Sequence, residues 1–222
     1  MTAFITGAGS GIGAATALRF AKEGWDVILV GRRVDALKSV ADLVTKNKSP
    51  GTPHVCPLDI SKPEEAHTLA KWLEARPEIA KRISAVVHNA GIYEQATTLT
   101  SSDESWHRMF ETNLFGVIRL TQVLYPFLKT NRGSLTTVSS TLGQRPTPNT
   151  PAYSASKAAL INWGHSFAKE VAGDGVRVNC VCPGIVDTPI HSARPQPGDG
   201  DILKALGPLH PLGRVGRPEE VA

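Results

Sequence analysis

Short apolar runs alternate with longer amphipathic stretches along most of this chain. The short runs are nearly uninterrupted and rich in β-branched residues, which predicts buried strands, while the stretches between them have helical spacing. We expect strands at Thr2–Thr6, Asp26–Val30, His54–Leu58, Ile83–His88, Ser134–Ser139 and Val176–Cys182, and helices at Ile12–Glu23, Val34–Lys46, Pro63–Ala75, Asp103–Leu128 and Pro151–Ala172.

Strands that are apolar throughout must be covered on both faces, which is typical of parallel sheets joined by helices. The pattern therefore predicts an α/β, doubly wound Rossmann fold in one domain over residues 1–222. Six strands fit the order 3-2-1-4-5-6, with a ligand crevice at the carboxyl ends of the strands.

Two proline-rich segments interrupt the alternation. Residues 146–151 lead into a helix, with Thr150 placed to cap it and Pro151 at its first position. Residues 187–218 are rich in proline and glycine, and a loop of this length is usually functional or disordered. We expect a flap over the crevice, with a loose surface loop as the alternative.

Composition narrows the class of protein. The chain has 222 residues, 41% of them hydrophobic, which excludes a largely disordered chain. A net charge of +4 is too small to indicate nucleic-acid binding. No apolar run is long enough to cross a membrane, and the N-terminus does not resemble a signal peptide. Three cysteines, an odd number, favour a reducing, cytoplasmic location.

A glycine-rich turn, TGAGSGIG, follows the first predicted strand and leads directly into a helix. Glycines let a phosphate approach the backbone, and the helix start offers free N–H groups. The spacing is not G-x-G-x-x-G, and no G-K-[ST] follows, which excludes a Walker loop. A glycine turn that binds no ligand is the alternative.

The end of the second predicted strand discriminates between dinucleotides. An NAD site needs an acidic residue there, but Gly31 occupies that position and Arg32 and Arg33 follow. A guanidinium can bind a 2′-phosphate through two hydrogen bonds, so we expect NADP(H). Solvated arginines are the alternative, as is NAD bound through Asp35, which falls inside the next helix.

Tyr153 and Lys157 lie four residues apart, on one face at the start of a predicted helix. A nearby ammonium group favours the phenolate form of tyrosine, so the pair could act as a general acid or base on an alcohol or ketone. An ordinary pair on a helix surface is the alternative. Ser140 favours the catalytic interpretation, because it ends a strand at the edge of the sheet where the crevice is expected.

The motifs resemble those of the short-chain dehydrogenase/reductase family over the whole chain. The glycine turn matches the family's TGxxxGIG, and HNAG at residues 88–91 matches its NNAG. RVNCVCPGIVDT looks like the segment that carries the nicotinamide, and HPLGRVGRPEEVA matches the next family element. The residues that match the family's catalytic set are Asn113, Ser140, Tyr153 and Lys157.

The resemblance implies a role for each matching position. Tyr153 would transfer the proton, while Lys157 would lower the pKa of Tyr153 and bind the nicotinamide ribose. Ser140 would orient the substrate oxygen. Asn113 would hold a relay water, with a tie across a helix kink as the alternative. Besides Tyr153 and Lys157, the resemblance implies residues for each part of the cofactor. These are Gly7, Ser10, Gly11, Ile12 and Gly13 at the pyrophosphate, Asp59 at the adenine, Asn89, Ala90 and Gly91 at the ribose, and Pro183, Gly184, Ile185 and Thr188 at the carboxamide. For Thr188, capping of a helix is the alternative.

The chain departs from the family pattern at two places. His88 replaces the first asparagine of NNAG, and we expect it to be a packed, hydrogen-bonded residue rather than an added catalytic group. The family usually continues beyond RPEEVA with a helix and a closing strand, so that strand is expected to be missing here. The other histidines show no metal-ligand spacing, and no metal is expected.

The sequence therefore predicts an NADP(H)-dependent oxidoreductase that acts on a carbonyl or alcohol substrate. Reduction of a 3-oxoacyl thioester, a sugar, a steroid or a small ketone are candidates. The alternative is an inactive dinucleotide-binding regulatory or scaffold protein. A homo-dimer or homo-tetramer is expected by analogy, through the helix that carries Trp163, Phe167 and Ala168.

Overall fold

Six parallel strands form a single sheet in the order β3-β2-β1-β4-β5-β6. The structure is a computed structural model that describes residues 1–190 and 205–222. The predicted fold and strand order are confirmed, and every predicted strand boundary agrees to within one residue. The strands are β1 (Thr2–Thr6), β2 (Asp26–Gly31), β3 (Pro53–Pro57), β4 (Ile83–His88), β5 (Ser134–Val138) and β6 (Arg177–Val181).

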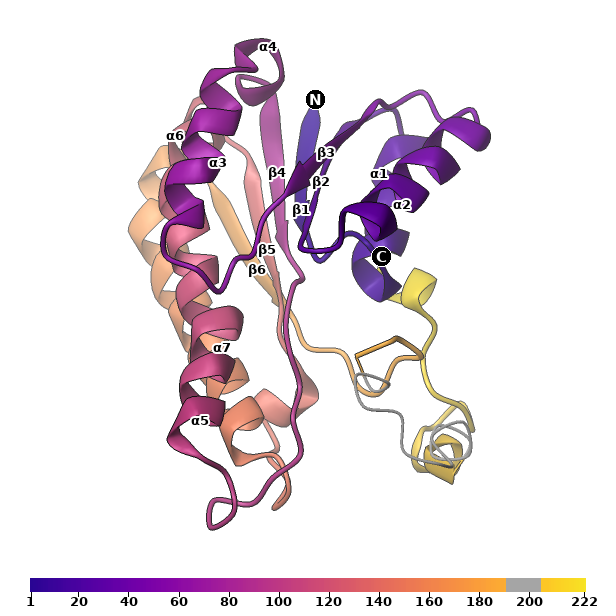
Figure 1. Cartoon of the computed structure of the whole chain (residues 1–222), viewed down its shortest axis with the longest axis vertical. Coiled ribbons are helices and arrows are strands. Elements are labelled where there is room, and N and C mark those ends of the chain that lie inside the picture. The colour runs from indigo at the N-terminus through magenta and orange to yellow at the C-terminus, as the bar shows by residue number, and fades with distance from the viewer. Residues whose placement is uncertain (191–204) are drawn as a thin grey trace.

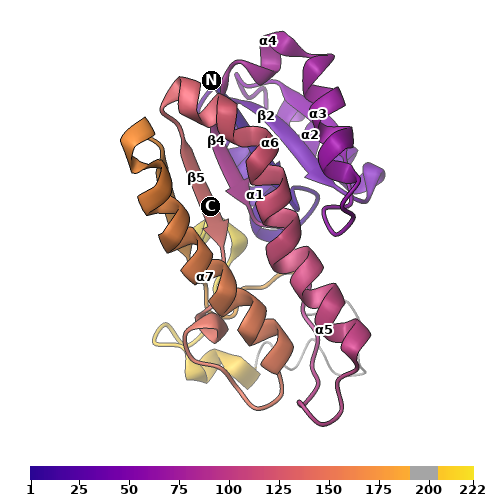
Figure 2. The same cartoon turned by 90° about the vertical axis from the view of Figure 1, so that its left-hand side faces the viewer.

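Helices cover both faces of the sheet (Figures 1 and 2). Because successive strand residues point to opposite faces, β1 contributes Phe4 to one core and Ile5 to the other. This explains the uninterrupted apolar runs in the sequence. The core around Ile5 includes residues of α1 (Gly11–Lys22) and α2 (Val34–Lys46), and the core around Phe4 includes residues of α3 (Glu65–Glu74), α6 (Gly116–Asn131) and α7 (Pro151–Val171).

The single long helix predicted over Asp103–Leu128 is wrong in one respect. The structure has α5 (Asp103–Phe110), then a π-helical turn η1 (Glu111–Phe115), then α6. A π turn inserts an extra residue without changing the local composition, so the apolar spacing does not reveal it. The turn carries Asn113, whose side chain is fully buried.

The start of α7 agrees only in part with the prediction. Thr150 occupies the N-cap position and Pro151 is the first helical residue. The Thr150 hydroxyl does not bond a backbone N–H of the helix, however. It contacts the hydroxyls of Ser154, at 3.1 Å, and Thr147, at 2.9 Å.

The remaining elements are short. They are α4 (Pro77–Ala80), which the sequence did not predict, and the 3-10 turns η2 (Thr141–Gly143), η3 (Ala172–Asp174), η4 (Gly207–Leu209) and η5 (Pro218–Glu220). Beyond β6, the described residues contain no further strand, only an isolated bridge between Val186 and Gly216. Much of the predicted flap, residues 191–204, lies outside the described residues. No helix in the described ranges is long and apolar enough to cross a membrane.

Candidate active site

Side chains from β5 and α7 meet at the carboxyl edge of the sheet. Strand β5 ends at Val138, and Ser139 and Ser140 follow. The first turns of α7 bring Tyr153 and Lys157 to the same place, and all of these residues are buried. The Lys157 Nζ donates to the Val138 carbonyl at 2.8 Å, which fixes α7 to the end of β5.

Tyr153 lies between Ser140 and a second tyrosine. The Tyr153 phenol is hydrogen-bonded to the Ser140 side chain, and the Leu142 N–H donates to the Ser140 Oγ at 3.1 Å. The ring of Tyr93 meets the Tyr153 ring edge to face, with centroids 5.1 Å apart. The Lys157 Nζ lies 5.8 Å from the centroid of the Tyr153 ring. Two hydroxyls and an ammonium group thus converge within one site.

Burial dominates the electrostatics of this site. It lowers the pKa of Lys157 to about 8, although the two nearby cysteines act to raise that value. It also raises the pKa of Tyr153, an effect that the Ser140 hydrogen bond opposes. The resemblance implied that Lys157 would lower the pKa of Tyr153. In the chain by itself, the cost of burying a phenolate outweighs any such effect.

Asn113 connects the π turn to the segment that follows β4. Its Oδ1 accepts from the Ile92 N–H at 2.9 Å, and its Nδ2 donates to the Ile92 carbonyl at 3.1 Å. Gly91 lies against both Asn113 and Lys157, because a Cβ on Gly91 would be 3.2 Å from the Asn113 Oδ1 and 3.3 Å from the Lys157 Nζ. Asn113 therefore belongs to the same cluster as the lysine, and it also ties the helix irregularity to the loop.

The glycine turn has no room for a side chain at Gly7 or Gly13, and we call the part of the turn between these two residues the cradle. Gly7 has a φ of +67°, and a Cβ at Gly13 would lie 2.2 Å from the Gly7 carbonyl oxygen. Thr6 supports the turn, because its Oγ1 accepts from the N–H groups of Asn89 and Ala90, both at 3.0 Å. Sequence reasoning did not assign a role to Thr6, although it is the first residue of the TGxxxGIG motif.

Helix α1 starts directly at the turn. Ser10 is its N-cap residue, and the Ser10 side chain makes no capping hydrogen bond. Ser10, Gly11 and Ile12 therefore surround the N–H end of the helix, which favours an anionic group. Gly11 has a φ of +53°, and a Cβ there would lie 3.0 Å from the Thr188 Cγ2. Thr188 is thus packed against the glycine turn.

At the end of β2, the small residue Gly31 leaves room for a ligand group, and Arg32 and Arg33 provide positive charge. Of the residues that the structure describes, a Cβ on Gly31 would approach only Leu37, at an ordinary contact distance of 3.4 Å. Arg32 and Arg33 are exposed, and within the described part of the chain neither forms an ion pair. Asp35 lies in the first turn of α2, as predicted.

The remaining predicted cofactor residues line the same edge of the sheet. Asp59 follows β3, and its Oδ1 accepts from the backbone N–H and the hydroxyl of Ser61, at 3.2 and 2.7 Å. Asn89 extends β4, and its Nδ2 donates to the Thr6 carbonyl at 3.1 Å. Ala90 follows Asn89. Asn89 and Ala90 thus lie against the glycine turn, whereas Asp59 lies at the same edge of the sheet with β2 between it and the turn.

The segment after β6 is held on two sides. The Pro183 carbonyl accepts from the Thr141 N–H at 2.9 Å, next to Ser140. Further on, the N–H of Gly216 donates to the Ile185 carbonyl at 2.9 Å, and the N–H of Asp187 donates to the Gly216 carbonyl at the same distance. Gly184 lies within this stretch.

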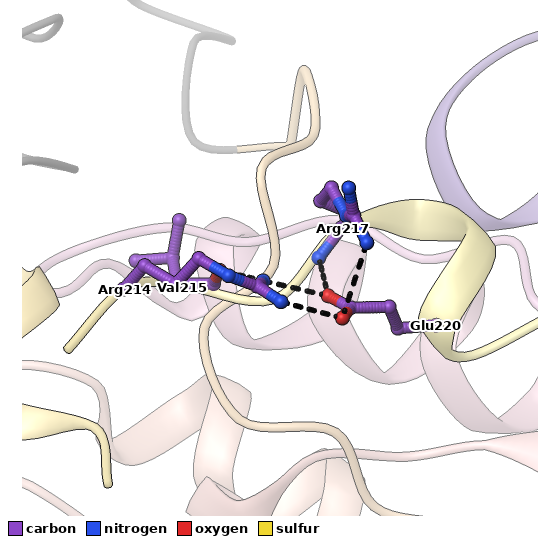
Figure 3. Close-up of polar contacts among 4 residues, drawn as sticks. All are labelled: Arg214, Val215, Arg217 and Glu220. Carbon is purple, nitrogen blue, oxygen red and sulfur yellow. Dashed lines mark hydrogen bonds and ion pairs between the residues drawn. The ribbon is translucent and has the colours of Figure 1, made fainter. Parts of the chain in front are cut away.

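Gly216, which pairs with the segment after β6, lies in a stretch held by contacts among Arg214, Arg217 and Glu220 (Figure 3). Arg214 binds Glu220 through two hydrogen bonds of 2.8 and 2.7 Å, and the Arg217 N–H donates to Glu220 at 2.7 Å. These bonds lower the pKa of Glu220 to about 2. Because Gly216 lies between the two arginines, the bracing fixes the strand-like bridge to Val186.

His88 is the packed residue that the sequence predicts. It is fully buried, and its Nε2 lies 2.9 Å from the Thr121 Oγ1. Cys180 and Cys182 are half-buried thiols with their sulfurs 3.9 Å apart. In residues 1–190 and 205–222, no group of three or more His, Cys, Asp or Glu side chains is placed to hold a metal ion.

Comparison with known proteins agrees with this geometry. A family model for short chain dehydrogenases matches residues 1–197. A 3-oxoacyl-(acyl-carrier-protein) reductase of Thermotoga maritima is 36% identical over 98% of this chain and 85% of the relative. A meso-2,3-butanediol dehydrogenase of Serratia marcescens is 31% identical over 98% of this chain and 82% of the relative. The crystal structure of L-sorbose reductase from Gluconobacter frateurii, complexed with NADPH and L-sorbose, has a TM-score of 0.89 and 30% identity, covering 99% of this chain and 86% of the other.

The fold and site thus define a Rossmann-type oxidoreductase that acts on CH–OH or C=O groups. The chain belongs to the short-chain dehydrogenase/reductase family.

Proposed function

We propose that this chain is an NADPH-dependent carbonyl reductase, or an alcohol dehydrogenase when it runs in the opposite direction. One observation carries the proposal: the hydrogen-bonded hydroxyls of Ser140 and Tyr153 lie beside the buried ammonium of Lys157. Residues 1–222 would form one domain that both binds the dinucleotide and carries out the reaction.

The residues at the sheet edge fit a dinucleotide with a 2′-phosphate. The cradle at Gly7 and Gly13 excludes side chains and would admit a pyrophosphate at the start of α1. Arg32 and Arg33 are exposed at the end of β2, beside the small Gly31, where a 2′-phosphate would be bound. The L-sorbose reductase with the similar fold was solved with NADPH, which supports the same choice here.

The chain's own residues would handle the proton and the oxygen. NADPH, when bound, supplies the hydride to the carbonyl carbon. Tyr153 would donate its phenolic proton to the carbonyl oxygen, and the Ser140 hydroxyl would donate a hydrogen bond to the same oxygen. Lys157 would stabilise the phenolate that remains, since a buried phenolate needs a nearby positive charge.

The substrate class proposed first is a 3-oxoacyl thioester. The support is the similarity to the Thermotoga maritima reductase, whose name states that substrate. Sugar and small-ketone reduction are further candidates, because L-sorbose reductase and meso-2,3-butanediol dehydrogenase are similar over nearly the whole chain.

Replacing Tyr153 with phenylalanine tests the proposed reaction. The variant should lose turnover by about 1,000-fold or more in an NADPH-oxidation assay with a ketone panel, because it has no proton to donate. Its affinity for NADPH should stay within about twofold, since the ring is kept. An active Tyr153→Phe enzyme would contradict the assignment. A wild-type protein that binds NADPH tightly but turns over no ketone would instead favour the inactive, regulatory alternative.

Replacing Arg32 with alanine tests the cofactor choice. Loss of one charged hydrogen-bonding partner should weaken NADPH binding by about 10-fold or more and leave NADH binding nearly unchanged. Fluorescence titration with both cofactors measures this. The exposed Arg19, which is paired with Glu23 on α1, offers a matched arginine control as Arg19→Ala. Equal affinity of the wild type for the two cofactors would refute the proposal.

We further propose a homo-dimer or homo-tetramer in the cytoplasm. Trp163 stacks on Phe167 with ring centroids 5.3 Å apart, but Phe167 is largely buried within the chain's own core. Of these two aromatic residues of α7, Trp163 is therefore the better candidate for a contact between copies. Light scattering of the wild type and of Trp163→Ala tests this, and a monomeric wild type would reject it.

A further inference from the structure

Ser156 occupies the centre of the site without belonging to the predicted set. It is the residue before Lys157 on α7, and its side chain is fully buried. A buried hydroxyl is costly unless it is hydrogen-bonded, so its partners indicate what it does. Both of its partners are parts of the proposed catalytic machinery.

The two hydrogen bonds of Ser156 have defined directions. Its Oγ donates to the Tyr153 backbone carbonyl at 2.7 Å and accepts from the Asn113 Nδ2 at 3.0 Å. Because the hydroxyl proton is used by Tyr153, the lone pair of the oxygen faces Asn113. The hydroxyl thus connects the backbone of the tyrosine to the side-chain amide of the asparagine.

Within the described part of the chain, the Asn113 amide has no hydrogen-bond partners other than Ser156 and the backbone of Ile92. The Ile92 N–H donates to Oδ1 and the Ile92 carbonyl accepts from Nδ2. Ile92 belongs to the chain segment after β4, whereas Ser156 belongs to α7. Ser156 is therefore the direct link from the asparagine amide to the helix that carries Tyr153 and Lys157.

We propose that Ser156 is a positioning residue of the active site, whose hydroxyl holds the Asn113 amide in register with Tyr153 and Lys157. The inference rests on the proposed function for its effect on turnover. Gly91 lies close to both the Asn113 Oδ1 and the Lys157 Nζ. A small displacement of Asn113 would therefore also shift Gly91 and the position of the Lys157 ammonium group. A misplaced group in an active site lowers the rate more than it lowers binding.

The test compares Ser156→Ala with Ser154→Ala. Ser154 is a matched control, because it is a buried serine of the same helix whose hydroxyl contacts Thr150 instead of Asn113. We expect Ser156→Ala to lower kcat about 10-fold while KM and the Kd for NADPH stay within about twofold. Ser154→Ala should keep the wild-type kcat. Ser156→Thr, which retains the hydroxyl, should recover most of the loss.

A double-mutant cycle with Asn113→Ala decides whether Ser156 acts through the asparagine. If it does, the double variant is no slower than Asn113→Ala alone. Independent, multiplying losses would overturn the proposal, and so would an unchanged kcat in a folded Ser156→Ala protein. Equal losses in the Ser156 and Ser154 variants would overturn it as well.

A measurement without turnover separates this proposal from the proposed function. Hydrogen exchange of the Asn113 side-chain amide can be followed by NMR and assigned with Asn113→Ala. We expect exchange to be about 10-fold faster in Ser156→Ala than in the wild type, because one buried N–H loses its partner. Unchanged exchange would reject the link even if the protein reduced no ketone. Faster exchange in a protein without turnover would keep the link and reject the reductase.

Discussion

Replacing His88 with asparagine is expected to remove a defined part of this protein's sensitivity to acid. The His88 side chain is buried at the end of the central strand β4, and burial lowers its pKa to about 3. The Thr121 hydroxyl donates to the Val117 carbonyl at 2.8 Å, so it accepts from the His88 Nε2, which carries the proton of the neutral ring. Among the described residues, the His88 Nδ1 has no hydrogen-bond partner that would stabilise a second proton.

The magnitude follows from the two protonation states. In the unfolded chain the ring titrates with a pKa near 6.5, whereas in the folded chain it stays neutral down to about pH 3. Below pH 6.5 the unfolded chain therefore binds the extra proton, and stability falls as the pH falls. Each pH unit is worth about 1.4 kcal/mol, so at pH 4.5, two units below 6.5, the free energy of unfolding should be lower by about 3 kcal/mol on account of His88. Above pH 6.5 the full stability is present.

Urea unfolding of the wild type and His88→Asn at pH 7.5, 5.5 and 4.5 measures this contribution. The difference between the two proteins in free energy of unfolding should change by about 3 kcal/mol between pH 7.5 and pH 4.5, whatever its value at neutral pH. His107 is exposed, and His107→Gln serves as a control that should follow the wild type. Parallel loss of stability in the wild type and His88→Asn would refute the reasoning.

Two further substitutions test the glycine cradle and its support. Gly13→Ala should lower the free energy of unfolding by about 3 kcal/mol and prevent NADPH binding, because its Cβ would lie 2.2 Å from the Gly7 carbonyl oxygen. Gly173→Ala is the control, because no described residue lies within 4 Å of a Cβ at Gly173, and a stable, NADPH-binding Gly13→Ala would contradict the cradle. Thr6→Val should cost about 2 kcal/mol in urea unfolding, since two N–H groups lose their acceptor, and Thr6→Ser should restore the loss. A Thr6→Val variant as stable as Thr6→Ser would contradict the role of the hydroxyl as an acceptor.

The sequence alone predicted the sheet because each strand has apolar residues on both faces. The strand order followed from this pattern, since parallel strands joined by helices can be arranged in few ways. The positions of Ser140, Tyr153 and Lys157 at one sheet edge followed in turn. These residues were expected to lie close together despite their separation in the sequence, because the ends of the strands and the starts of the following helices meet at that edge.

Other parts of the site could not be read from spacing. The π turn at Asn113 depends on how the helix packs against the chain at Ile92, which is a tertiary effect. A lowered pKa of Tyr153 was expected from the charge of Lys157 and the positive end of the helix, whereas burial, which no single residue reveals, has the largest effect and raises that pKa. The Ser156 hydroxyl was overlooked because serine is common on helices and one of its two partners, Asn113, comes from a distant segment.

The contact between Gly11 and Thr188 has a consequence for the order in which the protein becomes functional. The glycine turn is synthesised before strands β2 to β6, whereas Thr188, which packs over Gly11, is synthesised after all six strands. Strand β1 must also wait for β4 before its second edge is paired. A nascent chain therefore cannot enclose a ligand at the glycine turn before all six strands have been synthesised. Because a domain generally folds as a unit, enclosure should follow formation of the sheet.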